Sequence, residues 1–109
     1  MTSEQQIMQI ITHGGNARSS CLKAVEKAQS NEWDEVETLF EQADESLTKA
    51  HQIQTQLIQA EIKGEEVDIS LFMIHAQDHL MNALTVKDLS KALVEEIKMR
   101  KSDKERKIK

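Results

Sequence analysis

The sequence predicts an all-α protein, folded as an antiparallel up-down-up bundle of three helices. The 109-residue chain has no proline, three glycines and three aromatic residues, and residue types that favour long helices dominate it. Its apolar residues recur at intervals of three and four, which is the period of one helix face. Two short polar segments separate three such stretches, and short connections join antiparallel neighbours. No alternating run or hairpin signal suggests a sheet.

The first helix is expected over residues 4–30. One face of it carries apolar and small residues: Ile7, Ile10, Ile11, Gly14, Cys21, Ala24, Val25 and Ala28. Two glycines, Gly14 and Gly15, interrupt the helix, and each costs about 1 kcal/mol relative to alanine. Their presence indicates close approach of another helix or a local kink. No glycine-rich phosphate-binding pattern surrounds them.

The second helix is expected to begin after Asn31, a residue type that caps helix N-termini, and to end near Ile62. Gly64 suits the left-handed position that follows a helix. The third helix is predicted to begin near Asp68 or Ser70 and to end near Arg100. Residues 1–100 thus form one helical domain, and residues 101–109 form a basic, flexible tail.

Charge is unevenly distributed along the chain. The net charge is −5, yet residues 98–109 contain seven basic and two acidic residues and carry a local charge of +5. The acidic remainder argues against a general nucleic-acid-binding protein. The basic segment is either a solvated tail or a patch that meets an acidic partner or an anionic membrane surface.

The sequence indicates a cytoplasmic protein. It shows no signal peptide and no apolar run of about 18 residues. Its single cysteine, Cys21, excludes an internal disulfide framework and fits a reducing compartment. Cys21 falls on the apolar face of the first helix and is expected to be a small core residue, not a nucleophile.

The third helix is apolar in nearly every direction over residues 71–84. Such a helix is usually buried on all sides, and three helices cannot enclose one of their own members. We therefore expect this helix to line a subunit interface. The apolar residues are Leu71, Phe72, Met73, Ile74, Leu80, Met81 and Leu84.

One polar stripe interrupts this apolar segment at helical spacing. Its members are His75, Asp78, His79 and Asn82. Buried polar groups are costly unless they are paired, so a stripe of four requires an explanation. A hydrogen-bonded network that sets subunit register in a structural adaptor is one explanation. The others are a zinc site built from two imidazoles and a carboxylate, and a phosphocarrier histidine.

The zinc-site and phosphocarrier interpretations each require particular residues, which can be looked for in the sequence. The metalloprotease pattern needs glutamate directly after the first histidine, where this chain has Ala76, so zinc hydrolysis is disfavoured. A phosphocarrier needs a nucleophilic imidazole with polar neighbours. Because the chain has no nucleotide-binding loop, the phosphoryl group would come from another phosphoprotein and not from ATP.

Three segments carry a resemblance to a known family. Residues 73–81, Met-Ile-His-Ala-Gln-Asp-His-Leu-Met, resemble the signature of the lactose/cellobiose-type enzyme IIA of the bacterial sugar phosphotransferase system. Residues 15–19 and 50–58 are also similar to this family. Alanine at position 76 resembles the cellobiose/chitobiose branch, which implies a β-glucoside disaccharide, whereas glycine there is typical of the lactose branch.

The resemblance implies a homotrimer in which His75 is phosphorylated at Nε2. His75 would accept the phosphoryl group from the phosphocarrier protein HPr and pass it to a cysteine of the IIB component, which serves the membrane IIC transporter. Three copies of Asp78 would surround one divalent cation, Mg²⁺, at the threefold axis. His79 and Gln77 would support the phosphohistidine. The remaining histidines, His13 and His51, are interpreted as structural or interface residues.

Overall fold

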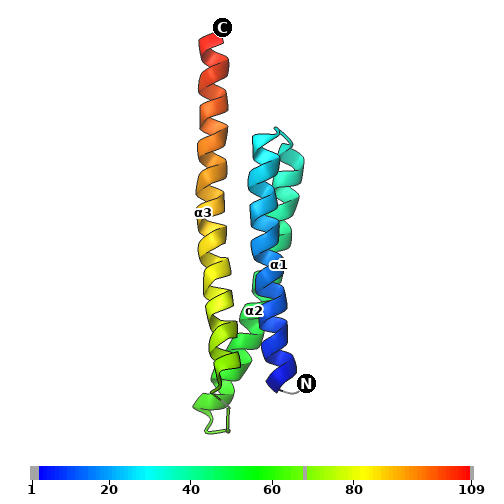
Figure 1. The fold of residues 1–109 in the computed structure, drawn as a ribbon, viewed down its shortest axis with the longest axis vertical. Helices are drawn as coiled ribbons and strands as arrows, with labels where there is room; N and C mark the ends of the chain where they lie inside the picture. Colours follow the sequence, from blue (N-terminus) through cyan, green and yellow to red (C-terminus); the bar gives the residue numbers. More distant parts are fainter. Residues whose placement is uncertain (1–2, 68, 109) are drawn as a thin grey trace.

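The computed structural model describes residues 3–67 and 69–108, and this part of the chain forms three long helices. They are α1 (Ser3–Gln29), α2 (Trp33–Ile62) and α3 (Leu71–Ile108). The predicted up-down-up bundle is confirmed, and no strand occurs in the described residues (Figure 1). None of the helices, over those residues, is long and apolar enough to cross a membrane.

Helix α1 is the central member of the bundle because it packs along both other helices. Helices α2 and α3 contact each other much less. Small residues on α1 allow this close packing. They lie at three-to-four spacing and are all buried: Gly14, Ala17, Cys21, Ala24 and Ala28. The large side chains of Ile10 and Leu80 are fully buried beside them.

The turn between α2 and α3 follows its local sequence. Gly64 has a φ of 84°, so it adopts the left-handed conformation predicted for it. The amide of Gly64 donates to the carbonyl of Glu61, and the amide of Glu65 donates to that of Ala60, both at 3.0 Å. Ser70 then caps α3, because its Oγ accepts from the amide of Met73 at 3.2 Å. Asp68, the other predicted start, lies outside the described residues.

The prediction that Asn31 caps α2 is wrong. Glu32 occupies the N-cap position without a side-chain cap, and Asn31 adopts a φ of 62° one residue earlier. Asparagine tolerates this left-handed conformation better than most residues, which explains its place in the turn. Its Oδ1 accepts a hydrogen bond from Lys101 Nζ on α3 at 2.9 Å, a partner 70 residues away.

The predicted end of α3 near Arg100 is also wrong, since the helix reaches Ile108. It extends past the turn that joins α1 and α2 (Figure 1). Lys101, which we assigned to the tail, donates to the carbonyls of Ala28 and Gln29 at 2.9 and 2.8 Å. A lysine is favourable there because the C-terminus of α1 is the negative end of its dipole. Flexibility of residues 101–109 stays a prediction.

Replacing Lys101 with alanine is expected to lower the free energy of unfolding by about 1–2 kcal/mol, because carbonyls at the end of α1 lose their cap. Chemical denaturation at a fixed protein concentration measures the change. Lys104→Ala removes an equal charge one turn later and is expected to cost less than about 0.5 kcal/mol. Equal losses in the two variants would contradict a capping role.

Candidate functional site

The histidine pair lies near the start of α3, on two successive turns. His75 is exposed, and His79 is half-buried. Their ring centroids are 4.7 Å apart with an interplanar angle of 80°, so the two imidazoles meet edge to face. The spacing of four residues places them one above the other on the helix. His75 therefore offers an accessible imidazole whose ring rests against a second, less exposed one.

Gly14 of α1 brings that helix against the backbone of the histidine pair. A Cβ at Gly14 would lie 3.6 Å from the carbonyl oxygen of His79 and 3.8 Å from the Cα of Leu80. The predicted close approach of another helix is therefore confirmed at Gly14. The space around Gly15 is open, and nothing in the structure requires glycine there. The glycine in α1 and the histidine block in α3 are thus parts of one contact.

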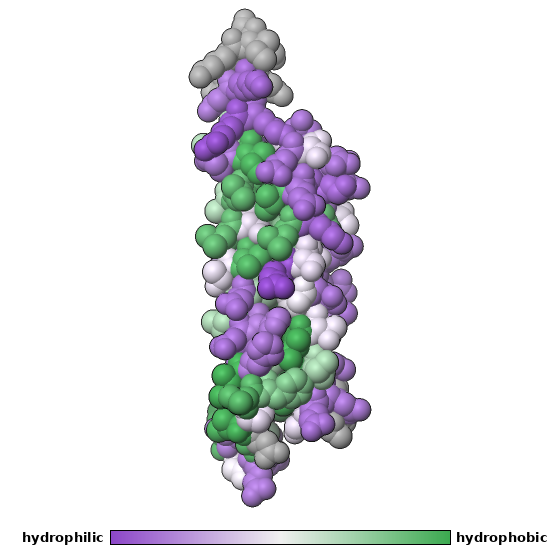
Figure 2. All heavy atoms as spheres, viewed as in Figure 1, coloured by the Kyte–Doolittle hydropathy of each residue, from purple (hydrophilic) through white to green (hydrophobic). Residues whose placement is uncertain are grey.

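Asp78 lies on the side of α3 that is opposite to the residues facing the core. Its neighbours on the open side are large apolar residues that a single chain leaves exposed: Leu71, Ile74, Met81 and Leu89. The exposed fractions of Leu71 and Leu89 are 85% and 65%. The core-facing side consists of Met73, Ala76, Leu80 and Ala83. On the face seen in Figure 2, hydrophobic surface follows α3 in two stretches with a hydrophilic stretch between them.

The polar stripe predicted on α3 is therefore not buried within one subunit. His75, Asp78 and Asn82 are exposed, and only His79 is partly covered. Helix α3 is apolar all round in sequence, but α1 and α2 cover only one side of it. The apolar residues of the other side are exposed in a single chain.

Gln77 faces α2 and not His75. Its Oε1 accepts a hydrogen bond from Gln54 Nε2 on α2, and its own Nε2 lies 3.9 Å from Met73 Sδ. Two residues along a helix correspond to about 200° of rotation, so Gln77 and His75 occupy different faces. One chain does not bring these two predicted site residues together. Gln54 is a residue of this region that sequence reasoning missed, since only the tertiary structure pairs it with Gln77.

The described residues of one chain do not assemble the predicted zinc site. In the described residues, no group of three or more His, Cys, Asp or Glu side chains could hold a metal ion. Asp78 offers carboxylate oxygens, which are the ligands that Mg²⁺ prefers. A single carboxylate needs further ligands, so a shared ion would require more than one chain.

Cys21 is a core residue, as its place in the sequence predicts. It is fully buried, and burial is the main cause that raises the pKa of its thiol. Lys87 and Lys91 lower that pKa, and Asp44, which lies 2.5 Å from Lys87 Nζ, raises it. A buried thiol with a raised pKa stays protonated near pH 7 and is a poor nucleophile.

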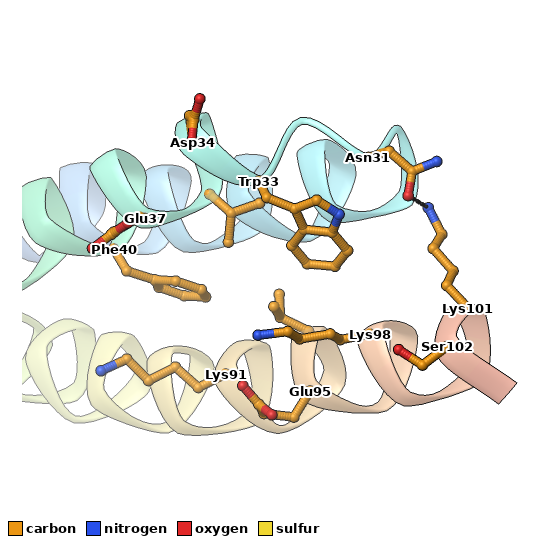
Figure 3. A pocket seen from close by; sticks show the side chains of 12 residues that line it. Asn31, Trp33, Asp34, Glu37, Phe40, Lys91, Glu95, Lys98, Lys101 and Ser102 are labelled. Atoms are coloured by element: carbon orange, nitrogen blue, oxygen red, sulfur yellow. Dashed lines mark hydrogen bonds between the residues drawn. The ribbon is translucent and has the colours of Figure 1, made fainter. Parts of the chain in front are cut away.

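One groove in the described structure lies away from the histidines. It has a volume of about 790 Å³ and runs between α2 and the C-terminal half of α3. In Figure 3, Trp33 and Phe40 of α2 point toward Lys91 and Lys98 of α3. Lys91 follows His75 by 16 residues, which corresponds to roughly 24 Å along the helix. This groove is therefore separate from the histidine site of the same chain.

Comparison with known proteins gives a consistent result. The family model of the lactose/cellobiose-specific IIA subunit of the phosphotransferase system (PTS) matches residues 5–98. The lichenan-specific phosphotransferase enzyme IIA component of Bacillus subtilis is 51% identical over 92 residues, which cover 84% of each chain. The cellobiose-specific EIIA component of Lactococcus lactis is 43% identical over 88 residues, or 81% of this chain and 76% of the relative.

Solved structures agree with the sequence relatives. The cellobiose-specific enzyme IIA from Bacillus anthracis has a TM-score of 0.90 and 41% identity over 94% of both chains. The IIA(Chitobiose)–HPr complex of Escherichia coli gives a TM-score of 0.81 and 29% identity over 93% of this chain and 98% of that one. The chain belongs to the lactose/cellobiose-specific IIA family and is a phosphotransferase component of the PTS.

Proposed function

We propose that the protein is a phosphocarrier that accepts a phosphoryl group from phospho-HPr on His75 and passes it to a cysteine of a IIB component. The observation that carries this proposal is the exposed His75 imidazole, held against the His79 ring at the family's histidine block. An exposed neutral imidazole can act as a nucleophile near pH 7. A known relative in complex with HPr supports HPr as the donor.

Two in-line transfers account for the activity. In the first, the lone pair of His75 Nε2 attacks phosphorus while the donor's phosphohistidine N–P bond breaks, and the donor imidazole keeps that electron pair. In the second, a IIB thiolate attacks the same phosphorus, an S–P bond forms, and the His75 N–P bond breaks. His79 contributes by holding the His75 ring in place, which reduces the freedom lost on reaching the transition state.

The assay for this proposal supplies phosphoenolpyruvate, enzyme I and HPr to the purified protein. We expect one acid-labile phosphate per chain, with a ³¹P chemical shift that identifies Nε2 phosphohistidine. An unlabelled protein would overturn the proposal and leave the structural adaptor as the alternative. A label at another residue would move the carrier role away from His75.

We further propose that the protein acts as a homotrimer with the open side of α3 at its centre. The large apolar residues that flank Asp78 would lose contact with water there, which is favourable at about 25 cal/mol per Å². Three Asp78 carboxylates would meet at the axis, and a divalent cation such as Mg²⁺ fits their hard oxygen ligands. The ion would offset their mutual repulsion and would have no part in the phosphoryl transfer.

Replacing Asp78 with leucine is expected to preserve the trimer and to remove its dependence on metal, because apolar groups replace like charges in the interface. Light scattering in the presence and absence of a chelator measures both properties. Asn82→Leu is a matched control on the same exposed face, and we expect it to retain the metal dependence of the wild type. A monomeric wild type would contradict the three-carboxylate site.

For the transported sugar we propose a β-glucoside disaccharide of the cellobiose or chitobiose type. Alanine at position 76 supports this choice, as do relatives named for lichenan and cellobiose. A panel of IIB components provides the measurement. Faster phosphoryl transfer to a lactose-type IIB than to a cellobiose-type IIB would contradict it.

A further inference from the structure

A second carboxylate lies on the open side of α3, far from the histidine pair. Glu96 follows Asp78 by 18 residues, which corresponds to about five helical turns and about 27 Å along the helix. The two residues therefore lie on the same face of α3. On either side of Glu96 are Leu93 and Met99, large apolar residues that are 48% and 61% exposed. Glu96 thus interrupts an apolar surface, as Asp78 does near the other end of the helix.

Glu96 differs from Asp78 because a cation accompanies it. Arg100, one turn later on the same side, donates a hydrogen bond from its Nε to Glu96 Oε1 at 2.9 Å. Residues 74–82, which surround Asp78 on the helix, contain no lysine or arginine. An exposed pair such as Glu96 and Arg100 contributes little to the stability of a single chain. The same pair contributes more where apolar neighbours exclude water from it.

We propose that Glu96 and Arg100 form a ring of ion pairs between three copies of the chain, at the C-terminal end of the α3 interface. The pair is self-complementary, because each copy brings one carboxylate and one guanidinium, and the ring therefore has no net charge. Arg100 lies about 40° around the helix from Glu96, toward one neighbour. A guanidinium has five N–H donors, so Arg100 can bind its own Glu96 and the neighbour's Glu96 together. This inference rests on the proposed trimer.

The ring would make the two ends of the interface chemically different. Three Asp78 carboxylates need an added cation, whereas the Glu96 ring supplies its own. The ring would also fix the register of the three helices. A slip of one helix by two turns would place its Glu96 beside Leu89 of its neighbours and bury a charge without its partner, which is costly. A polar layer in an apolar interface selects one register in this way.

Cysteine cross-linking tests the position of the ring. In Glu96→Cys the three introduced thiols would lie together at the axis, so oxidation or a short bifunctional thiol reagent is expected to link two chains on a denaturing gel. Glu95→Cys, the adjacent exposed position, lies about 100° around the helix and is expected to stay unlinked. The wild type, with only the buried Cys21, gives the background. Equal linking at the two positions would overturn the proposal.

Removing one charge at a time tests whether the pair is enclosed between copies. Glu96→Leu or Arg100→Leu leaves the other charge unpaired, so the concentration at which half of the trimer dissociates is expected to rise about tenfold or more. The double replacement by leucine removes both charges and is expected to return this concentration to the wild-type value or below it. Glu95→Leu is the matched control and should not change it. Wild-type behaviour of both single variants would contradict the ring.

Sedimentation of the wild type separates failure of the ring from failure of the proposed trimer. A monomeric wild type would contradict the trimer, and the ring would fail with it. A trimeric wild type that neither links in its Glu96→Cys form nor responds to the single replacements would reject the ring alone. The responses are expected to be equal with and without a chelator, because the ring contains no metal. A response that disappears with the chelator would also reject the ring.

Discussion

Replacing His75 with glutamine is expected to reduce phosphoryl labelling by phospho-HPr to background. The change removes the only nucleophilic nitrogen that the proposed mechanism uses, and an amide cannot form a stable phosphoryl intermediate. The side chain of His75 is exposed, so the substitution leaves no cavity and no unpaired buried group. Labelling and thermal unfolding measured on the same preparation separate loss of chemistry from loss of fold.

Two other histidines provide matched controls for this variant. His51 is exposed on α2, and His13 is half-buried on α1. We interpret both as structural or interface residues, so His13→Gln and His51→Gln are expected to label fully. His79→Gln should label more slowly than the wild type, because the His75 ring loses its edge-to-face contact. Full labelling of His75→Gln would reject the phosphocarrier mechanism at this residue.

Replacing Gly14 with leucine is expected to lower the free energy of unfolding by about 1–3 kcal/mol and to slow phosphoryl transfer. The Cβ of any side chain at Gly14 already reaches contact distance from the His79 carbonyl, so further atoms must push α1 and α3 apart. The displaced backbone is the one that carries the histidine pair. Denaturant unfolding therefore measures the loss of stability, and the rate of labelling measures the effect on the histidine pair. Both follow from the same separation of α1 and α3.

The neighbouring glycine makes this a paired experiment. Gly15→Leu introduces the same side chain into open space, and replacing a helical glycine is expected to stabilise the fold by up to about 1 kcal/mol. Gly14→Ala adds a Cβ at an ordinary contact distance of 3.6 Å and should be tolerated. Similar losses in the two leucine variants would show that the contact with His79 does not determine the effect.

The parts of the fold that sequence predicted correctly depend on short-range chemistry. The three-to-four spacing of apolar residues defines each helix face, and Gly64 and Ser70 end and begin helices through bonds to nearby residues. The approach to Gly14 was predictable because a glycine inside a helix is costly without a reason. The place of the histidine block on α3 followed from the same periodicity.

The errors arose where a distant residue competes with a local preference. Asn31 is a residue type that commonly caps helices, but its Oδ1 accepts a hydrogen bond from Lys101 of α3. Residues after Arg100 have the composition of a solvated tail, yet Lys101 supports the end of α1. Neither contact leaves a periodic or local signal, because its partners are about 70 residues apart in the chain.

By itself the sequence determined the helical bundle, its family and the histidine block, because these depend on residue type and local spacing. Only the tertiary structure decided which side of α3 remains open and which residue holds Gln77. It placed α1 against one side of α3, left the Asp78 side uncovered, and brought Gln54 of α2 to Gln77. The physical reason is that several faces of α3 are almost equally apolar in sequence. The packing of the three helices decides which of these faces is buried.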